Sequence, residues 1–136
     1  MSESGVTVLV VDDHPVVRRG LSTFLANEPD MHVIGSAASG EEALTMAETM
    51  HPALVLMDLS MPGIGGIEAT RRLVAMDPAV RVVMLTSFGG HERMVEALKA
   101  GAMGYVVKDT APADMLRALR QVMSGSGEVS IEHSGS

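Results

Sequence analysis

The chain lacks cysteine and tryptophan altogether, and aromatic residues make up 2% of its 136 positions. Without cysteine it can form neither disulfides nor thiolate-bound metal sites. No apolar run approaches the length of a membrane span, and the N-terminus has no charged-then-apolar signal pattern. We therefore expect a cytoplasmic protein with no membrane partner. Basic residues are scarce as well, and the net charge of −7 disfavours direct contact with nucleic acid.

The residues that are present predict one globular α/β domain. Apolar residues make up 46% of the sequence and charged residues 20%, which favours a single folded core. Short apolar runs predict buried strands, which we place at Val6–Val11, His32–Ala37, Ala53–Met57, Val80–Leu85 and Tyr105–Val107. Apolar residues at helical spacing follow each strand, with helix starts at Pro15, Ser39 and Pro112. Because strands alternate with helices, we predict a doubly wound parallel sheet.

Polar residues stand where four of these strands end. Asp12 and Asp13 follow the first strand, and Asp58 follows the third. Thr86 follows the fourth strand and Lys108 the fifth. Each residue alone would also suit an ordinary helix cap or turn. Since the carboxyl ends of parallel strands meet at one edge, where ligands bind to such sheets, their joint placement predicts a site there.

The residue types at this edge point to phosphoryl transfer. Carboxylates that meet at one site repel one another and raise each other's pKa, and a divalent cation relieves that repulsion. The site offers oxygen ligands, which suit Mg²⁺ together with water and a phosphate oxygen. A carboxylate nucleophile, a metal, a lysine and a hydroxyl are what transfer of a phosphoryl group to an aspartate requires. We interpret His14, beside the acidic pair, as the residue that leads into the first helix.

Four segments carry a resemblance to a known family: VLVVDDHPVVRRGL, VLMDLSMPGIGGIEAT, VVMLTSF and GAMGYVVKD. Together they resemble the receiver domain of a two-component response regulator. DDHP with GYVVKD is most similar to receivers of the NarL/LuxR (FixJ-like) type. The resemblance covers residues 5–124 and implies a flavodoxin-like (βα)5 fold, a five-stranded parallel sheet in the order 2-1-3-4-5. We interpret residues 125–136, which are rich in Ser and Gly, as a linker or terminal tail.

The resemblance also implies a role for each residue around the metal. Asp58 is similar to the phosphoacceptor and would share in binding Mg²⁺. Asp13 resembles a direct Mg²⁺ ligand, whereas Asp12 would act mainly through water. The backbone carbonyl of Ser60 would complete the protein ligands.

The remaining site residues resemble a phosphate-binding and switching set. Thr86 would bind one phosphoryl oxygen, and Lys108 would pair with another. Tyr105 is similar to the aromatic residue that turns inward as Thr86 moves toward the phosphate. Ser60 and Phe88 stand at positions that tune attack by water on the phosphate in similar receivers. Because Phe88 is bulky and apolar, we expect a slowly hydrolysed phosphate.

The function that this resemblance implies is a signalling switch rather than an enzyme. A sensor histidine kinase would phosphorylate Asp58, and the chain would catalyse no more than its own phosphorylation and dephosphorylation. The switch would regulate transcription through a DNA-binding output domain that lies outside this sequence, with a phosphorylation-linked homodimer as a further state. We therefore expect the chain to be part of a longer protein, with a stand-alone receiver as the alternative.

Two other functions use similar residues. A phosphatase of the haloacid-dehalogenase type also combines an Asp nucleophile with Mg²⁺, but it requires Asp-x-Asp after its first strand. Here Asp12 and Asp13 are adjacent, and a lone Asp58 follows the third strand. A flavin or nucleotide binder would need a loop that cradles phosphate after the first strand. The corresponding segment, DDHPVV, is acidic and has no glycine, which disfavours that function.

Overall fold

Strands and helices alternate along the chain, as the sequence predicts. The computed structural model describes residues 5–87, 91–125 and 129–131. The elements in order are β1 (Val6–Val11), α1 (Pro15–Ala26), β2 (Met31–Ala37), α2 (Gly40–Met50), β3 (Leu54–Asp58), α3 (Gly65–Met76), β4 (Arg81–Thr86), α4 (His91–Ala100), β5 (Gly104–Val107), α5 (Pro112–Met123) and β6 (Val129–Ile131). Every predicted strand is present, with bounds that differ from the prediction by one residue at most. Among the described residues, no helix has the length and apolar character needed to cross a membrane.

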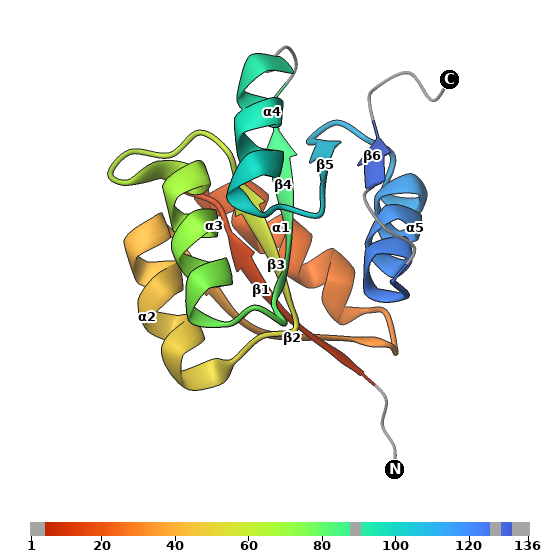
Figure 1. Ribbon diagram of the computed structural model, residues 1–136. Coiled ribbons are helices and arrows are strands. Elements are labelled where there is room, and N and C mark those ends of the chain that lie inside the picture. Colours follow the sequence, from red (N-terminus) through yellow and green to blue (C-terminus); the bar gives the residue numbers. More distant parts are fainter. Residues whose placement is uncertain (1–4, 88–90, 126–128, 132–136) are drawn as a thin grey trace.

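The strands form one parallel sheet in the order β2-β1-β3-β4-β5-β6 (Figure 1). The predicted order of the first five strands is confirmed. The sixth strand, β6, was not predicted, because we interpreted residues 125–136 as a linker or tail. It pairs with the edge of β5, with Gly104 opposite Val129 and Val106 opposite Ile131. A strand of three residues carries too little periodicity to be found in the sequence, since its partner is distant in the chain.

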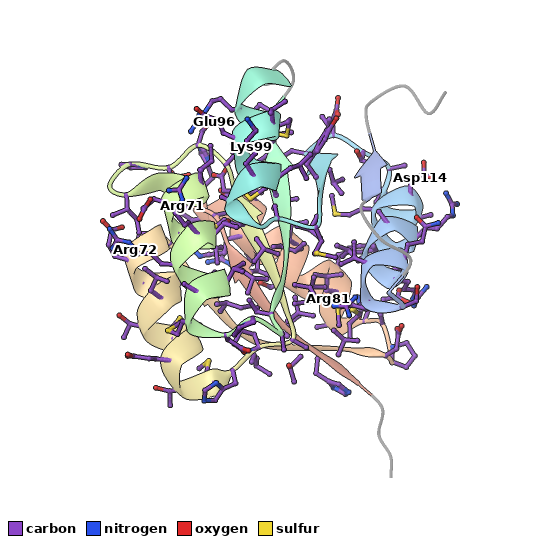
Figure 2. All side chains as sticks on the ribbon, in the orientation of Figure 1. Arg71, Arg72, Arg81, Glu96, Lys99 and Asp114 are labelled. Atoms are coloured by element: carbon purple, nitrogen blue, oxygen red, sulfur yellow. The ribbon has the colours of Figure 1, made fainter. Side chains whose placement is uncertain are left out.

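Helices cover both faces of the sheet, which explains why its strands are continuously apolar. Successive strand residues point to opposite faces, so Leu9 packs in one core and its neighbour Val10 in the other. Helices α2, α3 and α4 contribute to the first core, while α1 and α5 contribute to the second. Figure 1 shows these two groups of helices on either side of the strands. Charged side chains such as Arg71 and Arg72 point outward from this layered body (Figure 2).

The helix ends follow local signals in the sequence. Ser39 caps α2, and its Oγ accepts the backbone N–H of Glu42 at 3.1 Å. The Glu42 carboxylate in turn accepts the backbone N–H of Ala38 at 2.7 Å, one residue before the cap. Gly101 follows α4 with a φ of +119°, which a residue with a side chain rarely adopts. Because β1, β3, β4 and β5 pair in parallel, their carboxyl ends lie at one edge of the sheet.

Candidate functional site

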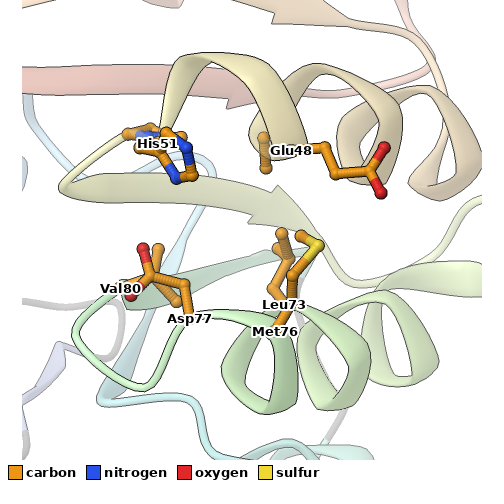
Figure 3. Close-up of a pocket in the computed structure, with 8 residues that line it drawn as sticks. Glu48, His51, Leu73, Met76, Asp77 and Val80 are labelled. Carbon is orange, nitrogen blue, oxygen red and sulfur yellow. The ribbon is translucent and has the colours of Figure 1, made fainter.

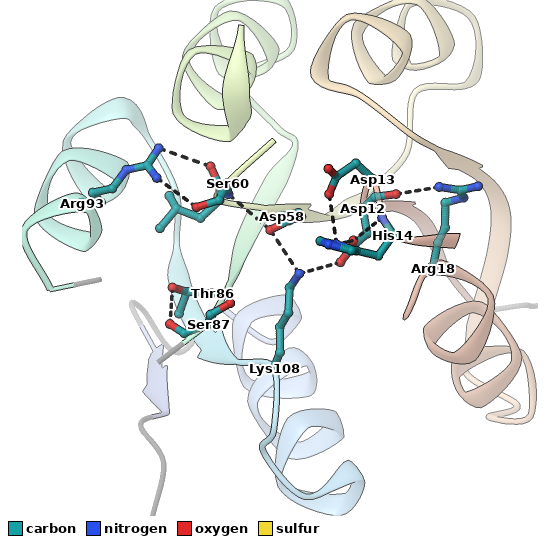
Figure 4. Close-up of polar contacts among 11 residues, drawn as sticks. Asp12, Asp13, His14, Arg18, Asp58, Ser60, Thr86, Ser87, Arg93 and Lys108 are labelled. Atoms are coloured by element: carbon teal, nitrogen blue, oxygen red, sulfur yellow. Dashed lines mark hydrogen bonds and ion pairs between the residues drawn. The ribbon is translucent and has the colours of Figure 1, made fainter. Parts of the chain in front are cut away.

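The predicted site residues lie together at the carboxyl edge of the sheet (Figure 4). Asp12 follows β1 directly, Asp58 is the last residue of β3, and Thr86 is the last residue of β4. Lys108 follows β5 and extends its side chain back toward β1 and β3. Residues nearly a hundred positions apart are therefore brought into contact by the order of the strands, as predicted.

Lys108 joins two of the carboxylates. Its Nζ lies 3.0 Å from Asp12 Oδ2 and 3.3 Å from Asp58 Oδ1. Burial works to lower the pKa of Lys108, but the hydrogen bonds and charges of Asp12 and Asp58 outweigh that effect and raise the pKa above its ordinary value. The ammonium group is therefore firmly charged and compensates part of the negative charge that the strands bring together.

Asp12 is fully buried, with a hydrogen bond at one carboxylate oxygen and an ion pair at the other. Its Oδ1 accepts the backbone N–H of His14 at 2.9 Å, and its Oδ2 faces Lys108. Burial alone would raise the pKa of this carboxyl, but the His14 N–H and Lys108 together hold the pKa below its usual value. Arg18 also contacts this residue, because its Nη1 donates a hydrogen bond to the Asp12 backbone carbonyl at 2.7 Å. Asp12 is therefore a fixed anion that organises the site.

Asp58 is almost as deeply buried but has fewer partners. Its side chain is 3% exposed, and its Oδ1 accepts the backbone N–H of Ser60 at 3.2 Å. Burial, followed by the charge of Asp12, raises the pKa of Asp58 to about 6. Its Oδ2 is buried without a hydrogen-bond partner among the described residues. Asp58 is thus an ionised carboxylate at neutral pH with one oxygen that the protein leaves available.

Asp13 completes a cluster that can hold a cation. The cluster consists of Asp12, Asp13, His14 and Asp58. Each residue contributes one possible metal-ligand atom, and these four atoms all lie within 4.8 Å of one another. The Asp13 side chain is 27% exposed, in contrast to the buried side chain of Asp12. Carboxylate oxygens at this spacing, of which Asp12 Oδ2, Asp13 Oδ1 and Asp58 Oδ2 are buried without a hydrogen bond among the described residues, fit the donor set that Mg²⁺ prefers. The residues present therefore suit the metal that the sequence predicts.

His14 has more contacts than its predicted role requires. It is the residue before α1, as expected, but its side chain does not cap the helix. Instead its Nδ1 lies 3.1 Å from Asp12 Oδ1 and 3.1 Å from Asp13 Oδ1, with the ring 64% exposed. The sequence offered one signal for this, the direct adjacency of His14 to the acidic pair.

Thr86 and Tyr105 lie on the neighbouring strands. The Thr86 hydroxyl donates to the backbone carbonyl of Ser87 at 2.8 Å, so it is engaged at its own strand end. The Tyr105 ring is 9% exposed and belongs to the core on the side of α4. Phe88, for which we predicted an effect on hydrolysis, lies outside the described residues.

A contact from α4 to this site was not predicted. Arg93 Nη1 donates to Ser60 Oγ at 2.9 Å, and its Nη2 lies 3.4 Å from the Leu59 carbonyl oxygen. This arginine reaches across from the third residue of α4 to the segment that follows Asp58 (Figure 4). No local motif could predict the contact, because it joins residues 33 positions apart.

A small pocket lies at the opposite end of the strands. It is lined by the ends of α2 and α3 and includes His51, Leu73 and Asp77 (Figure 3). These residues precede β3 and β4, whereas Asp58 and Thr86 terminate the same strands. The pocket is therefore separate from the acidic cluster.

A model of the response regulator receiver domain matches residues 8–120. The chain belongs to the response regulator receiver family. This receiver is 39% identical over 124 residues to the nitrate/nitrite response regulator NarL of Escherichia coli K12, a match that covers 91% of this chain and 57% of NarL. It is 43% identical over 123 residues to the uncharacterised transcriptional regulatory protein YhcZ of Bacillus subtilis, covering 90% of this chain and 57% of YhcZ.

Solved structures place the receiver in the same group. A LuxR-family two-component response regulator from Aurantimonas sp. SI85-9A1 superposes with a TM-score of 0.87 and 35% identity, covering 96% of this chain and 91% of that one. The receiver domain of the putative response regulator NarL from Mycobacterium tuberculosis gives a TM-score of 0.85 and 28% identity, covering 90% of this chain and 99% of that one. The receiver thus has the predicted flavodoxin-like fold and NarL/LuxR-type relatives, and it spans little more than half the length of NarL and YhcZ.

Proposed function

We propose that this receiver accepts a phosphoryl group on Asp58 and acts as a phosphorylation-dependent switch. The observation that carries the proposal is the state of Asp58: a buried carboxylate with an unpartnered Oδ2, beside Lys108 and within reach of the acidic pair. A carboxylate of this kind is available as a nucleophile, while the surrounding charges can position an anionic donor. Receivers are regulatory phosphoacceptors, so the donor would be the phosphohistidine of a sensor kinase.

In the transfer, an Asp58 carboxylate oxygen attacks phosphorus and the P–N bond of phosphohistidine breaks. The electron pair of that bond returns to the imidazole, which takes up a proton from solvent. Asp13, Asp58 and the Ser60 carbonyl would hold Mg²⁺, with Asp12 acting through water. When bound, Mg²⁺ would supply charge neutralisation for the carboxylates and the phosphoryl oxygens. Lys108 would move one of its contacts from Asp58 to a phosphoryl oxygen.

The response to phosphorylation would run through Thr86. Its hydroxyl would leave the Ser87 carbonyl for a phosphoryl oxygen, and Tyr105 would take up the space that this movement opens. Phosphate acts in such a switch by favouring one of two existing arrangements. YhcZ is named a transcriptional regulatory protein, which supports an output in transcription. We further propose that a separate domain carries this output by binding DNA, and that the protein is cytoplasmic and forms a phosphorylation-linked homodimer.

Incubation with a small acyl phosphate and Mg²⁺ tests the proposal. We expect intact-mass measurement to find one added phosphoryl group per chain, and borohydride reduction followed by peptide mapping to place it on Asp58. Chelation of Mg²⁺ with EDTA should prevent the addition. Sustained turnover of an unrelated phosphoester would instead support a phosphatase of the haloacid-dehalogenase type, and a chain that gains no phosphate would contradict the switch.

Asp13→Ala is expected to weaken Mg²⁺ binding by about tenfold or more, and by more than Asp12→Ala does. Asp13 is the half-open carboxylate of the cluster, whereas both oxygens of Asp12 already have protein partners. Titration calorimetry with Mg²⁺ at fixed pH measures both affinities. Equal losses in the two variants would show that Asp12 and Asp13 do not divide the roles in this way.

A further inference from the structure

Arg93 connects α4 to the segment that carries the phosphoacceptor. It donates to Ser60 Oγ at 2.9 Å, while Ser60 donates its backbone N–H to Asp58 Oδ1 at 3.2 Å. The second contact of the guanidinium, at 3.4 Å, is to the carbonyl of Leu59. Ser60 therefore stands between the Asp58 carboxylate and the Arg93 guanidinium, and both flanking contacts hold it in place (Figure 4).

Arg93, like Arg18 and Arg81, donates to uncharged oxygens in the described part of the chain, whereas other arginines form ion pairs. Arg71, Arg72 and Arg120 each pair with a carboxylate. A cation so near the start of a helix also faces the positive end of the helix dipole, which disfavours it. Neither an ion pair nor the helix dipole explains why Arg93 contacts Ser60 and Leu59. A role in the chemistry of Asp58 would account for this contact.

We propose that Arg93 is a positioning residue that prolongs the life of the aspartyl phosphate by occupying the hydroxyl of Ser60. The inference rests on the proposed function, since it concerns loss of the phosphoryl group from Asp58. In that loss, water oxygen attacks phosphorus, the bond from phosphorus to the Asp58 oxygen breaks, and its electron pair returns to the carboxylate. The attacking water must be oriented and must pass a proton to an acceptor.

Ser60 is placed to assist that water, and Arg93 is placed to prevent it. The backbone N–H contact with Asp58 Oδ1 keeps Ser60 next to the reacting carboxylate, and its exposed side chain is accessible to water. The guanidinium N–H occupies a lone pair of Ser60 Oγ, and its positive charge makes the oxygen a poorer acceptor. The attacking water is thus deprived of an acceptor at this side of the site. Removal of the guanidinium frees the hydroxyl and speeds hydrolysis.

The test measures the phosphate half-life in four chains: the wild type, Arg93→Ala, Ser60→Ala and the double variant. Each is phosphorylated with an acyl phosphate and Mg²⁺, freed of donor, and followed by phosphate-affinity electrophoresis. Arg93→Ala is expected to shorten the half-life about fivefold, the rate equivalent of one net hydrogen bond. The same substitution in the Ser60→Ala background should change the half-life little, because the hydroxyl through which Arg93 acts is gone.

Two controls separate positioning from a general effect on the fold. Arg72→Ala removes an arginine that is 54% exposed and pairs with Glu68, and it should leave the half-life unchanged. Arg93→Lys keeps a cationic donor for Ser60 Oγ and should recover much of the wild-type half-life. An unchanged half-life in Arg93→Ala, or an equal shortening with and without the Ser60 hydroxyl, overturns this inference alone. Failure of the wild type to take up phosphate overturns both this inference and the proposed function.

Discussion

Asp58→Asn is expected to abolish phosphoryl uptake and, at the same time, to stabilise the metal-free fold at neutral pH. The loss follows because the amide is not a nucleophile for phosphorus. The gain follows because burial and the charge of Asp12 raise the pKa of Asp58 to about 6. The ionised carboxylate therefore lowers the free energy of unfolding at neutral pH. Asparagine has nearly the same shape without that charge, and we expect the free energy of unfolding to rise by about 1–3 kcal/mol.

The pH dependence of this gain has a definite sign. The pKa of Asp58 is about 6 in the folded state and near 3.8 in the unfolded state, so the folded chain binds more protons between these values. The Asp58 contribution to stability therefore falls as pH rises from about 4 to 6, and its penalty is complete above that range. The advantage of Asp58→Asn should be largest at pH 7 and above, and should disappear near pH 4.

Urea denaturation in EDTA at several pH values measures this effect. Glu96→Gln, which removes an exposed carboxylate on α4 (Figure 2), is the matched control and should show no comparable gain. An Asp58→Asn variant that is less stable than the wild type at pH 7.5, or equally favoured at pH 4, would contradict the assignment of Asp58 as the strained carboxylate of the site.

Gly66→Ala is expected to destabilise the fold by about 3 kcal/mol and to displace the phosphoacceptor segment. A Cβ at this position would lie 2.2 Å from the Asp58 carbonyl oxygen and 3.0 Å from the Leu59 Cα. Both atoms are backbone, so no side-chain rotation relieves the overlap, and either α3 or the end of β3 must move. Urea denaturation gives the loss of stability, and the rate of uptake from an acyl phosphate reports displacement of Asp58.

Gly20→Ala is expected to change the stability of the fold in the opposite direction. Gly20 lies within α1, is exposed, and has open space where a Cβ would stand. Alanine there restricts the unfolded chain without a clash, so we expect a gain of about 0.5–1 kcal/mol. If Gly66→Ala proved as stable as Gly20→Ala, that result would contradict the close contact between α3 and the phosphoacceptor segment.

The pattern of the sequence was enough to predict the sheet and to predict which residues meet at its carboxyl edge. Apolar runs at Val6–Val11 and Ala53–Met57 could be placed because strands buried on both faces need unbroken apolar residues, whatever surrounds them. Once the strands were placed, the residues at their ends had to meet at one edge. Lys108 therefore reaches Asp12 at 3.0 Å, although the two stand 96 positions apart. The resemblance to receivers added roles for these residues that their chemistry alone left open.

How the site residues share the available partners depends on packing between distant segments. The engagement of Asp12 by Lys108 and His14, which leaves Asp13 half-open, depends on distances that no pattern encodes. The contact of Arg93 with Ser60 and the pairing of β6 with β5 also join segments far apart in the chain. Local sequence specifies periodicity and helix caps, because those arise from neighbouring residues. Which side chain meets which across the sheet edge is set by packing, and it is this packing that leaves one oxygen of Asp58 unpartnered.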